Sequence, residues 1–344
     1  MTDLEQRIEA RSAAAVLRWS RDLVDPALRA AVGALQDPSR LIAGYHFGWW
    51  DEHGNGGGVR GGKAFRTALT LLSAEAAGGS AAEAVPAAAA VELVHNFSLL
   101  HDDVMDNDRM RRHRPTAWVV FGANAAILTG DVLQAKAMDV LAGSGHQAAV
   151  PAIRGLGQAL QDLVAGQHAD LAFEFRHDVT VTECVTMARR KTASLIAVAC
   201  TLGALFANAD ARHIRALRQF GFSTGLAFQH IDDLLGIWGD PAVTGKPAHA
   251  DLRARKKSLP VVAALTSDTS PGRELAALYT REEQLSEEDI LRAVELVEGA
   301  GGRAWSQDEV RRLLDGALAD LRPLMSPAAV ELAALARLVC HRDH

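Results

Sequence analysis

The chain has 344 residues, of which 49% are hydrophobic and only 5% aromatic, and its formal net charge is −6. This content is enough for a large core, and the alanine- and leucine-rich apolar set favours helix over sheet. The acidic balance argues against a general nucleic-acid-binding protein. Three irregularly spaced cysteines, Cys184, Cys200 and Cys340, indicate neither a disulfide framework nor a zinc site, so we expect a reducing, cytoplasmic compartment.

Neither the N-terminal residues nor the most apolar run suggests targeting to a membrane. Residues 1–19 are charged and helical in pattern, unlike a secretory signal. The most apolar run, residues 194–207, is too short to cross a bilayer. We therefore expect no integral membrane segment.

Apolar residues recur at the helical period along most of the chain. The predicted helices cover residues 4–19, 25–36, 63–78, 83–106, 117–142, 147–174, 181–207, 211–238, 256–266, 287–299, 306–320 and 327–341. No segment alternates for long enough to predict a sheet, and no low-complexity linker divides the sequence. We predict one all-α domain over residues 1–344, a single large helical bundle around a central cavity.

The first chemical signal in chain order is GGKAFR, residues 61–66, which follows the glycine-rich segment 51–62. It places Lys63 and Arg66 at the start of a predicted helix. Glycine loops that lead into helix N-termini favour anions. Each cation alone is more simply a surface residue, but this context favours an anion site.

The next signal is HDDVMDNDRMRRHRP, residues 101–115, where acids come first and arginines follow. Asp102 and Asp106 are four residues apart, so on a helix they share a face, together with His95 and Leu99. Carboxylates side by side at a buried helix end repel each other, and a hard divalent cation such as Mg²⁺ relieves this repulsion. Alone, the pattern also fits a solvated helix end.

A second acidic pair, Asp232 and Asp233, lies in FQHIDDLLGIWGD inside another apolar helix. If the two helices face each other, their carboxylates converge on one cavity. Mg²⁺ prefers a few protein carboxylates together with phosphate oxygens, so the expected ligand is a phosphate ester or diphosphate. Further cations come from three segments: RRKTASL with Lys191, TGKP with Lys246, and RARKKSLP with Lys256.

Together these motifs resemble the trans-isoprenyl diphosphate synthases, also called the polyprenyl synthetase family. The resemblance runs from about Gly61 to Pro260 and rests on seven motifs in the family's order. They are GGKAFR, HDDVMDNDRMRRHRPTAW, LTGDVLQAKA, GQHADL, KTASL, FQHIDD and GKPAHADLRARKKSLP. The resemblance implies the all-α isoprenoid synthase fold and a homodimer.

Carried over residue by residue, the resemblance implies a catalytic set of Asp102, Asp106, Asp232, Lys191 and Arg111. Asp102 and Asp106 would bind two Mg²⁺ ions, and Asp232 a third. The diphosphate of isopentenyl diphosphate would be bound by Lys63, Arg66, His95 and Arg112. The allylic diphosphate would be bound by Arg111, Lys191, Thr192, Gln229, Lys246 and Lys256.

The implied reaction is head-to-tail condensation of isopentenyl diphosphate with an allylic diphosphate. Phe97 and Ser98 stand five and four residues before Asp102, about one helical turn away, where the family uses bulk to set chain length. One large and one small residue suggest a C20 product, geranylgeranyl diphosphate, with C15 farnesyl diphosphate as the alternative.

Three departures from the family pattern bear on the site. Gly236 stands where the second motif usually ends in a third aspartate, which weakens the expected metal clamp. Thr67 stands where proline is frequent, and Arg255 where glycine is usual, so the sequence does not determine the local loop shape at either position.

Three other functions remain open at this stage. Glu92 with His95, and Glu174 with His177, both read Glu-x-x-His, a di-iron pattern in helical bundles. A class I terpene cyclase shares the acidic motif but needs no second diphosphate pocket. A non-catalytic subunit of a prenyl synthase is suggested by Gly236.

Overall fold

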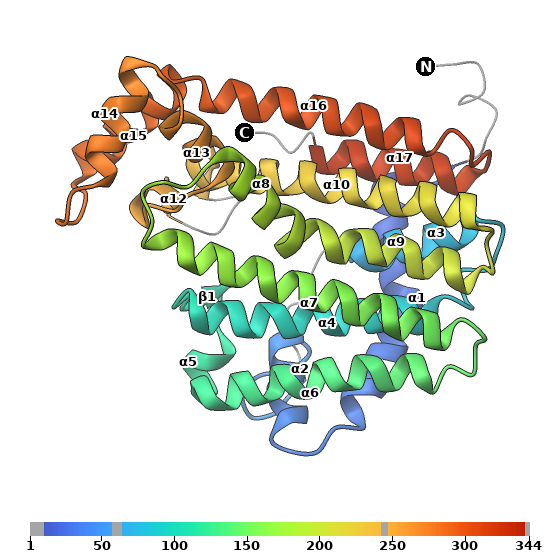
Figure 1. Cartoon of the computed structure of the whole chain (residues 1–344). Helices are drawn as coiled ribbons and strands as arrows, with labels where there is room; N and C mark the ends of the chain where they lie inside the picture. Colours follow the sequence, from blue (N-terminus) through green and yellow to red (C-terminus); the bar gives the residue numbers. More distant parts are fainter. Residues whose placement is uncertain (1–9, 57–63, 242–246, 341–344) are drawn as a thin grey trace. The chain divides into compact units, whose positions relative to one another are not determined.

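The computed structural model describes residues 10–56, 64–241 and 247–340 (Figure 1). Lys63 and Lys246, two of the lysines predicted to bind diphosphate, lie outside the described residues. The described chain is almost entirely helical, which confirms the all-α fold class. No helix in this part of the chain is both long and apolar enough to cross a membrane.

The helices and strands follow one another along the chain in this order: α1 (Ala13–Gly33), α2 (Ser39–Phe47), α3 (Phe65–Ala76), α4 (Val85–Met105), β1 (Met110–Arg111), β2 (Arg114–Pro115), α5 (Ala117–Phe121), α6 (Ala123–Ala142), α7 (Ala149–Glu174), α8 (Val181–Ala188), the π-helical segment η1 (Arg189–Ala193), α9 (Ser194–Phe206), α10 (Ala211–Trp238), α12 (Ala250–Arg253), α13 (Leu259–Leu265), α14 (Ser270–Tyr279), α15 (Glu287–Gly299), α16 (Gly302–Asp320) and α17 (Pro327–Cys340).

The chain divides into two compact units. The first contains residues 1–158, 198–218 and 323–334, and the second contains residues 159–197, 219–322 and 335–344. The chain passes from one unit to the other within α7, α9, α10 and α17, and between α16 and α17. The single domain expected from the sequence remains a prediction.

In the first unit, α4 packs along α6 and against α3 (Figure 1). Most residues in the middle of α4 are buried, and the small alanines at positions 87–90 near its start allow neighbouring helices to approach closely. In the second unit, one apolar cluster includes Ile231 and Leu259, and another includes Ile237 and Leu252. These clusters fix the C-terminal half of α10, which carries the second acidic pair.

The sequence did not predict α2 and α12, and three further departures from the predicted helices have physical explanations. The predicted helices 4–19 and 25–36 are wrong as separate elements, because α1 runs unbroken through Pro26. Residues 16, 20, 24, 28 and 32 form a buried stripe along the whole of α1. Burial of that stripe outweighs the cost of an internal proline, which is about 3 kcal/mol or more.

The other two departures have local causes. The predicted helix 117–142 is divided into α5 and α6 at Gly122, whose φ of 90° is incompatible with a continuous helix. Residues 266–273 lie between two predicted helices, but they contain the cap and the first turn of α14. Its Thr269 side chain caps the helix by accepting from the Gly272 N–H at 3.1 Å, with Pro271 in the first turn.

Candidate active site

The first acidic pair lies at the C-terminal end of α4, in the first unit. Asp102 is half-buried in the last turn, and Asp106 is the exposed C-cap residue. The Asp106 N–H donates to the Asp102 carbonyl oxygen at 2.8 Å, so the predicted helix extends to this point. The carbonyl groups at a helix C-terminus carry partial negative charge. This charge adds to that of both carboxylates and favours a cation here.

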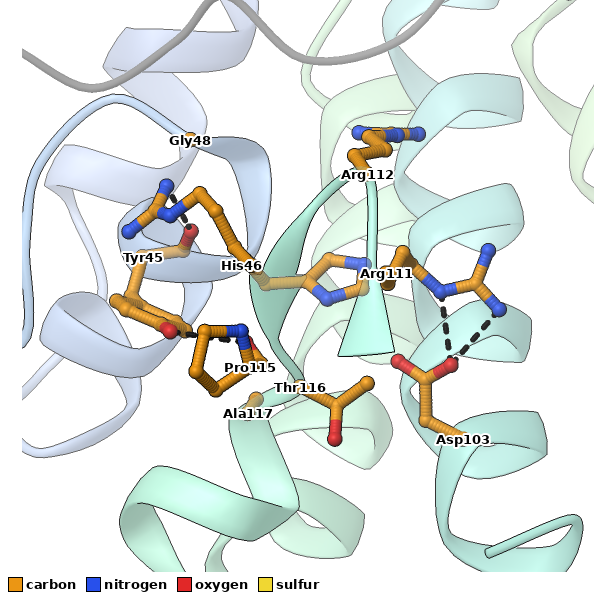
Figure 2. A pocket seen from close by; sticks show the side chains of 10 residues that line it. Tyr45, His46, Gly48, Asp103, Arg111, Arg112, Pro115, Thr116 and Ala117 are labelled. Atoms are coloured by element: carbon orange, nitrogen blue, oxygen red, sulfur yellow. Dashed lines mark hydrogen bonds and ion pairs between the residues drawn. The ribbon is translucent and has the colours of Figure 1, made fainter. Parts of the chain in front are cut away.

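The acid between them, Asp103, is buried at 1% exposure and holds the adjoining hairpin. Its Oδ1 accepts from both Nε and Nη2 of Arg111 at 2.7 Å (Figure 2). Burial raises the pKa of Asp103, and the Arg111 guanidinium opposes that rise. Arg111 lies on β1, and the turn to β2 is made by Arg112 and His113, with φ of 51° and 61°. The ion pair therefore fixes the arginine hairpin against α4.

A pocket opens beside this hairpin (Figure 2). It is lined by Tyr45, His46, Gly48, Asp103, Arg111, Arg112, Arg114, Pro115, Thr116 and Ala117. The Tyr45 hydroxyl donates to the Pro115 carbonyl at 2.8 Å, and Arg114 Nη2 donates to the Trp50 carbonyl at 3.1 Å. These bonds connect the wall of the pocket on α2 to the hairpin.

Two imidazoles lie near the guanidinium groups of this unit. Arg66 Nη1 lies 3.3 Å from His95 Nε2, and since a guanidinium only donates, that nitrogen accepts. Burial lowers the pKa of His95 well below its usual value, and Arg66 and Arg112 lower it further. Burial, Arg111 and Arg112 do the same for His46. Neutral imidazoles among guanidinium groups are surroundings suited to an anion.

His46 was not among the predicted site residues. It lies on α2, five residues before the glycine-rich segment 51–62, and no pattern around it assigns it a chemical role. Asp170, described below, was also missed, because it lies inside the quoted motif GQHADL but was assigned no role.

The start of α3 is held in shape by Thr67, one of the three departures from the family pattern. Thr67 Oγ1 donates to the Ala64 carbonyl at 2.8 Å and lies 2.9 Å from the Ser20 hydroxyl. Ala64, at the N-cap, has a φ of 52°. A threonine here therefore ties the beginning of α3 to α1, and Arg66 follows directly from this fixed turn.

The second acidic pair lies near the end of α10, in the second unit. Asp232 is exposed, whereas Asp233 is 3% exposed. Asp233 accepts from Gln229 Nε2 at 2.7 Å and from the Leu259 N–H at 2.8 Å. Burial raises the pKa of Asp233 to about 7. Asp233 therefore joins α10 to the start of α13, and Asp232 is left on the solvent side.

Lys191 and Thr192 lie in η1, where glycines allow two helices to approach closely. A Cβ at Gly166 of α7 would lie 2.3 Å from the backbone nitrogen of Lys191, and one at Gly225 of α10 would lie 2.7 Å from the Ala193 Cα. Any side chain at either position would force the backbones apart. The π-helical turn thus brings both predicted binding residues against α7 and α10.

Each of these two side chains has a partner from a neighbouring helix. Lys191 Nζ donates to Asp170 Oδ2 at 2.5 Å, and Thr192 Oγ1 donates to Gln229 Oε1 at 2.5 Å. Although burial raises the pKa of Asp170, Lys191 and Lys256 together lower it below its ordinary value. The structure therefore holds Lys191 and Thr192 in two side-chain pairs, one with Asp170 and one with Gln229.

Lys256 lies among acids of the same unit. Burial lowers its pKa, but Asp251, Asp233, Asp170 and Asp232 together raise it above the ordinary value of lysine. The neighbouring Lys257 is turned elsewhere, with Nζ donating to the Glu174 carbonyl at 3.0 Å. Lys256 therefore provides a permanent positive charge within this acidic group.

Arg255, another departure from the family pattern, adopts a φ of 48° in the position where glycine is usual. Its guanidinium donates to the backbone carbonyl groups of Arg281 and Glu283. These bonds stabilise the left-handed conformation, so the turn before Lys256 forms without glycine.

The two residues expected to set chain length are both buried on α4, at 5% exposure for Phe97 and 7% for Ser98. The Phe97 ring meets the edge of the His101 ring at a centroid distance of 4.7 Å. A Cβ at Gly130 of α6 would lie 3.5 Å from Phe97 and 2.4 Å from His101. The ring of Phe97 therefore lies at the close contact between α4 and α6.

The described residues give no support to a di-iron centre. Glu92 accepts from the Asn96 amide at 3.1 Å, and His95 is bonded to Arg66. In the part of the chain that the structure describes, no three His, Cys, Asp or Glu side chains gather as ligands for one metal ion. Mg²⁺ fits this donor set, because it often binds through one or two carboxylates plus substrate phosphates.

Comparison with known proteins places these features in a family. Residues 57–297 match the family model described as polyprenyl synthetase. Over 333 residues the chain is 46% identical to a geranylgeranyl diphosphate synthase of Mycobacterium tuberculosis, covering 96% of this chain and 94% of that protein. Over 300 residues it is also 46% identical to a (2E,6E)-farnesyl diphosphate synthase of the same species, covering 86% and 84%.

Solved structures agree. A polyprenyl synthetase from Streptomyces coelicolor superposes with a TM-score of 0.90 at 46% identity, covering 94% of this chain and 98% of that one. A geranylgeranyl pyrophosphate synthase from Corynebacterium glutamicum, complexed with isoprenyl diphosphate and magnesium, gives 0.81 at 27% identity, covering 95% and 99%.

The fold and these matches define a trans-isoprenyl diphosphate synthase, and the chain belongs to the polyprenyl synthetase family. It is a head-to-tail prenyltransferase of isoprenoid biosynthesis, as the sequence predicts.

Proposed function

We propose that this enzyme condenses isopentenyl diphosphate with allylic diphosphates as far as the C20 product, geranylgeranyl diphosphate. The observation that carries the proposal is the arrangement in the first unit. Two carboxylates lie at the end of α4, next to a hairpin and a pocket lined by three arginines and the neutral His46. Carboxylates and an anion pocket together suit a metal–diphosphate pair. The relative named geranylgeranyl diphosphate synthase supports the product length.

The metal ligands in this proposal are Asp102, Asp106 and Asp232, which together hold three Mg²⁺ ions. The complex of the Corynebacterium relative with magnesium and isoprenyl diphosphate supports the identity of the metal. In both motifs the outward-facing acids are the ones assigned to metal, while Asp103 and Asp233 are buried and bonded to protein. When bound, Mg²⁺ supplies Lewis-acid stabilisation of the charge that develops on the leaving diphosphate.

The two substrates occupy different groups of cations. Isopentenyl diphosphate binds to Lys63, Arg66, His95 and Arg112. Its diphosphate accepts hydrogen bonds from guanidinium groups and from the His95 imidazole. The lowered pKa of His95 keeps this imidazole uncharged. The allylic diphosphate binds to Arg111, Lys191, Thr192, Gln229, Lys246 and Lys256. Asp170 and Gln229 hold Lys191 and Thr192 in position before substrate arrives.

These residues divide between the two units. In the reaction, the C1–O bond of the allylic substrate breaks and its electron pair leaves with the diphosphate. Lys191, Lys256 and Arg111 stabilise that charge with donors already in place. The double bond of isopentenyl diphosphate then attacks C1, and a proton passes to the released diphosphate. Apolar walls keep water away from the cation.

Chain length is set, in this proposal, by Phe97 as the floor of the cavity, with the small Ser98 beside it. Both side chains are buried on α4, one turn before Asp102. Farnesyl diphosphate is the second candidate product, because a farnesyl diphosphate synthase matches at the same identity.

We also propose a homodimer working in the cytoplasm. Leu128 is 62% exposed and Ile127 is 37% exposed on α6, and a second copy would cover them. The three cysteines are free thiols in the structure, as expected in a reducing compartment. Sedimentation equilibrium of the wild type and of Leu128→Glu tests the dimer, which the substitution is expected to weaken.

Product analysis tests the function directly. The enzyme is incubated with isopentenyl diphosphate, Mg²⁺ and dimethylallyl, geranyl or farnesyl diphosphate in turn, and the products are identified by mass spectrometry. Geranylgeranyl diphosphate is expected as the end product from every starter. Accumulation of farnesyl diphosphate would overturn the C20 assignment alone, whereas hydrocarbon from a lone allylic diphosphate would indicate a cyclase.

A further inference from the structure

Gly236 lies one helical turn after Asp232 on α10, so a side chain there would share the face of Asp232. That space is already occupied. A Cβ at Gly236 would lie 2.5 Å from both Cγ and Oδ2 of Asp251, and 2.8 Å from its Oδ1. No aspartate fits at position 236 while Asp251 keeps this position. A side chain at position 236 and the Asp251 carboxylate in its present rotamer therefore compete for the same space.

Asp251 is held there by bonds on both sides of it. His249 Nδ1 donates to the Ile237 carbonyl at 2.5 Å, at the last turn of α10. Leu252 is fully buried in the same apolar cluster as Ile237. Arg253 makes a two-point ion pair with Glu287 at 2.5 and 2.7 Å. Because residues 249, 252 and 253 are all anchored, the backbone of Asp251 has little freedom to move away from Gly236.

Two polar groups next to Asp251 support a role in ligand binding. The Lys256 N–H donates to the Asp251 carbonyl at 2.8 Å, and Asp251 is the acid that most raises the pKa of Lys256, with Asp232 also contributing. The hydroxyl of Tyr279, which is 3% exposed, is buried without a protein partner within the described chain. Burial raises the pKa of Tyr279, and Asp251 raises it further. The surroundings of Asp251 thus include a lysine assigned to substrate and an unsatisfied buried hydroxyl.

We propose that Asp251 supplies the third carboxylate of the second metal site, in the space beside Gly236, and holds with Asp232 the Mg²⁺ ion of that site. The assignment rests on the proposed role of Asp232. It makes the second motif a composite of two segments: Asp232 from α10 and Asp251 from α12. Two carboxylates plus diphosphate oxygens are a usual ligand set for Mg²⁺. The glycine is then a compensated change rather than the mark of an inactive subunit.

The test measures metal binding without turnover. Mn²⁺ is titrated into the full-length protein with saturating inorganic diphosphate, and free Mn²⁺ is followed by electron paramagnetic resonance. Asp251→Ala is expected to weaken the binding of one Mn²⁺ by about tenfold or more, as is usual when a ligand or its support is lost. Asp268→Ala, which removes an exposed acid from the same unit, is the charge-matched control and should bind as the wild type does.

A swap of the carboxylate between the two segments makes the test specific. Gly236→Asp alone is expected to bind Mn²⁺ poorly and to melt at a lower temperature, because its side chain collides with Asp251. Gly236→Asp combined with Asp251→Ala returns a carboxylate to the same space, so its Mn²⁺ affinity should recover to near the wild-type value. A purely structural role for Asp251 predicts no recovery of metal affinity in the double variant.

The outcomes separate this inference from the assignment on which it rests. If Asp232→Ala loses the same Mn²⁺ and Asp251→Ala does not, Asp251 is not a ligand but the second site stands. If the swap variant is folded, as judged by circular dichroism, yet binds Mn²⁺ no better than Asp251→Ala, the inference is overturned as well. Retention of all Mn²⁺ by Asp232→Ala would instead show that the second metal site itself is wrong.

Discussion

The acidic ends of α4 and α10 are built on the same plan but completed differently. In each pair the first acid, Asp102 or Asp232, lies toward solvent, and the second is buried. Buried Asp103 is neutralised by Arg111, whereas buried Asp233 accepts from an amide and a backbone N–H and has a pKa raised to about 7. The adjacent aspartates therefore lie in different environments, and in the proposed site the first binds metal while the second holds the fold.

The third carboxylate distinguishes the two ends. On α4 it is Asp106, on the same helix and at its C-cap. On α10 the equivalent position is Gly236, and the nearest carboxylate comes from Asp251 on α12. A metal site built within one helix depends only on that helix, whereas a composite site depends also on how the following loop is held. The second end should therefore be more sensitive to changes outside its motif.

Removal of divalent metal is expected to have the largest effect, because both acidic ends require it. Exhaustive chelation should abolish turnover, and added Mg²⁺ or Mn²⁺ should restore it. The measurement is the rate of incorporation of labelled isopentenyl diphosphate. Full turnover in the chelated enzyme would show that neither acidic end needs a metal ion for catalysis.

Removal of single carboxylates should come next. Asp102→Ala, Asp106→Ala and Asp232→Ala should each lower kcat by about 10² to 10³ or more, as for the loss of transition-state charge stabilisation. Asp108→Ala serves as the control and should have far less effect, because it lies beyond the helix end. Equal losses at Asp102, Asp106 and Asp108 would show that the face assignment on α4 is wrong.

Removal of single cationic side chains should distinguish the binding of the two substrates. Arg66→Ala and Lys63→Ala are expected to raise the KM for isopentenyl diphosphate by about tenfold or more, the scale of a lost charged hydrogen bond. The KM for the allylic substrate should change less. Lys191→Ala should give the opposite pattern in steady-state kinetics. If Arg66→Ala affects mainly the allylic KM, the two pockets have been exchanged.

Substitution of the cavity floor should change the product and leave the chemistry intact. Phe97→Ala removes the ring that meets His101 and should lengthen the product by at least one isoprene unit, while Ser98→Phe should shorten it. Chromatography of the dephosphorylated products measures both. Unchanged products in both variants would place the floor on another helix.

The smallest effect concerns the buried acids. The raised pKa of Asp233, about 7 against an ordinary 3.8, means that the folded state binds its proton more tightly than the unfolded state. The free energy of unfolding should therefore fall as pH rises from about 4 to 7. In metal-free Asp233→Asn this fall should be smaller. Denaturant titrations at several pH values measure the slope, and an identical slope in both proteins would contradict the assignment.

The sequence was sufficient for features that depend on local spacing. The four-residue spacing of Asp102 and Asp106, the helical class and the family all follow from patterns along the chain. Partners distant in sequence could not be predicted in the same way. Asp170 lies 21 residues before Lys191, and their ion pair depends on the close approach that Gly166 allows.

Other misses have equally definite causes. His46 comes from a helix that carries no motif, and its place in the pocket is set by tertiary packing. Asp251 lies in a quoted motif, but its contact with Gly236 depends on tertiary packing, which no local pattern predicts. The predicted gap between helices 4–19 and 25–36 is absent, because burial of one continuous face carries α1 through Pro26.

The central claim is that both acidic helix ends bind the same allylic diphosphate through metal. A crystal structure of the full-length enzyme with Mg²⁺ and an unreactive allylic thiolodiphosphate tests it most directly. The account predicts Mg²⁺ ions that connect one diphosphate to Asp102 and Asp106 on one side and to Asp232 on the other, with Lys191 and Lys256 bound to the same group. Metal at only one of the two acidic ends, or a diphosphate bound without Asp232, would contradict it.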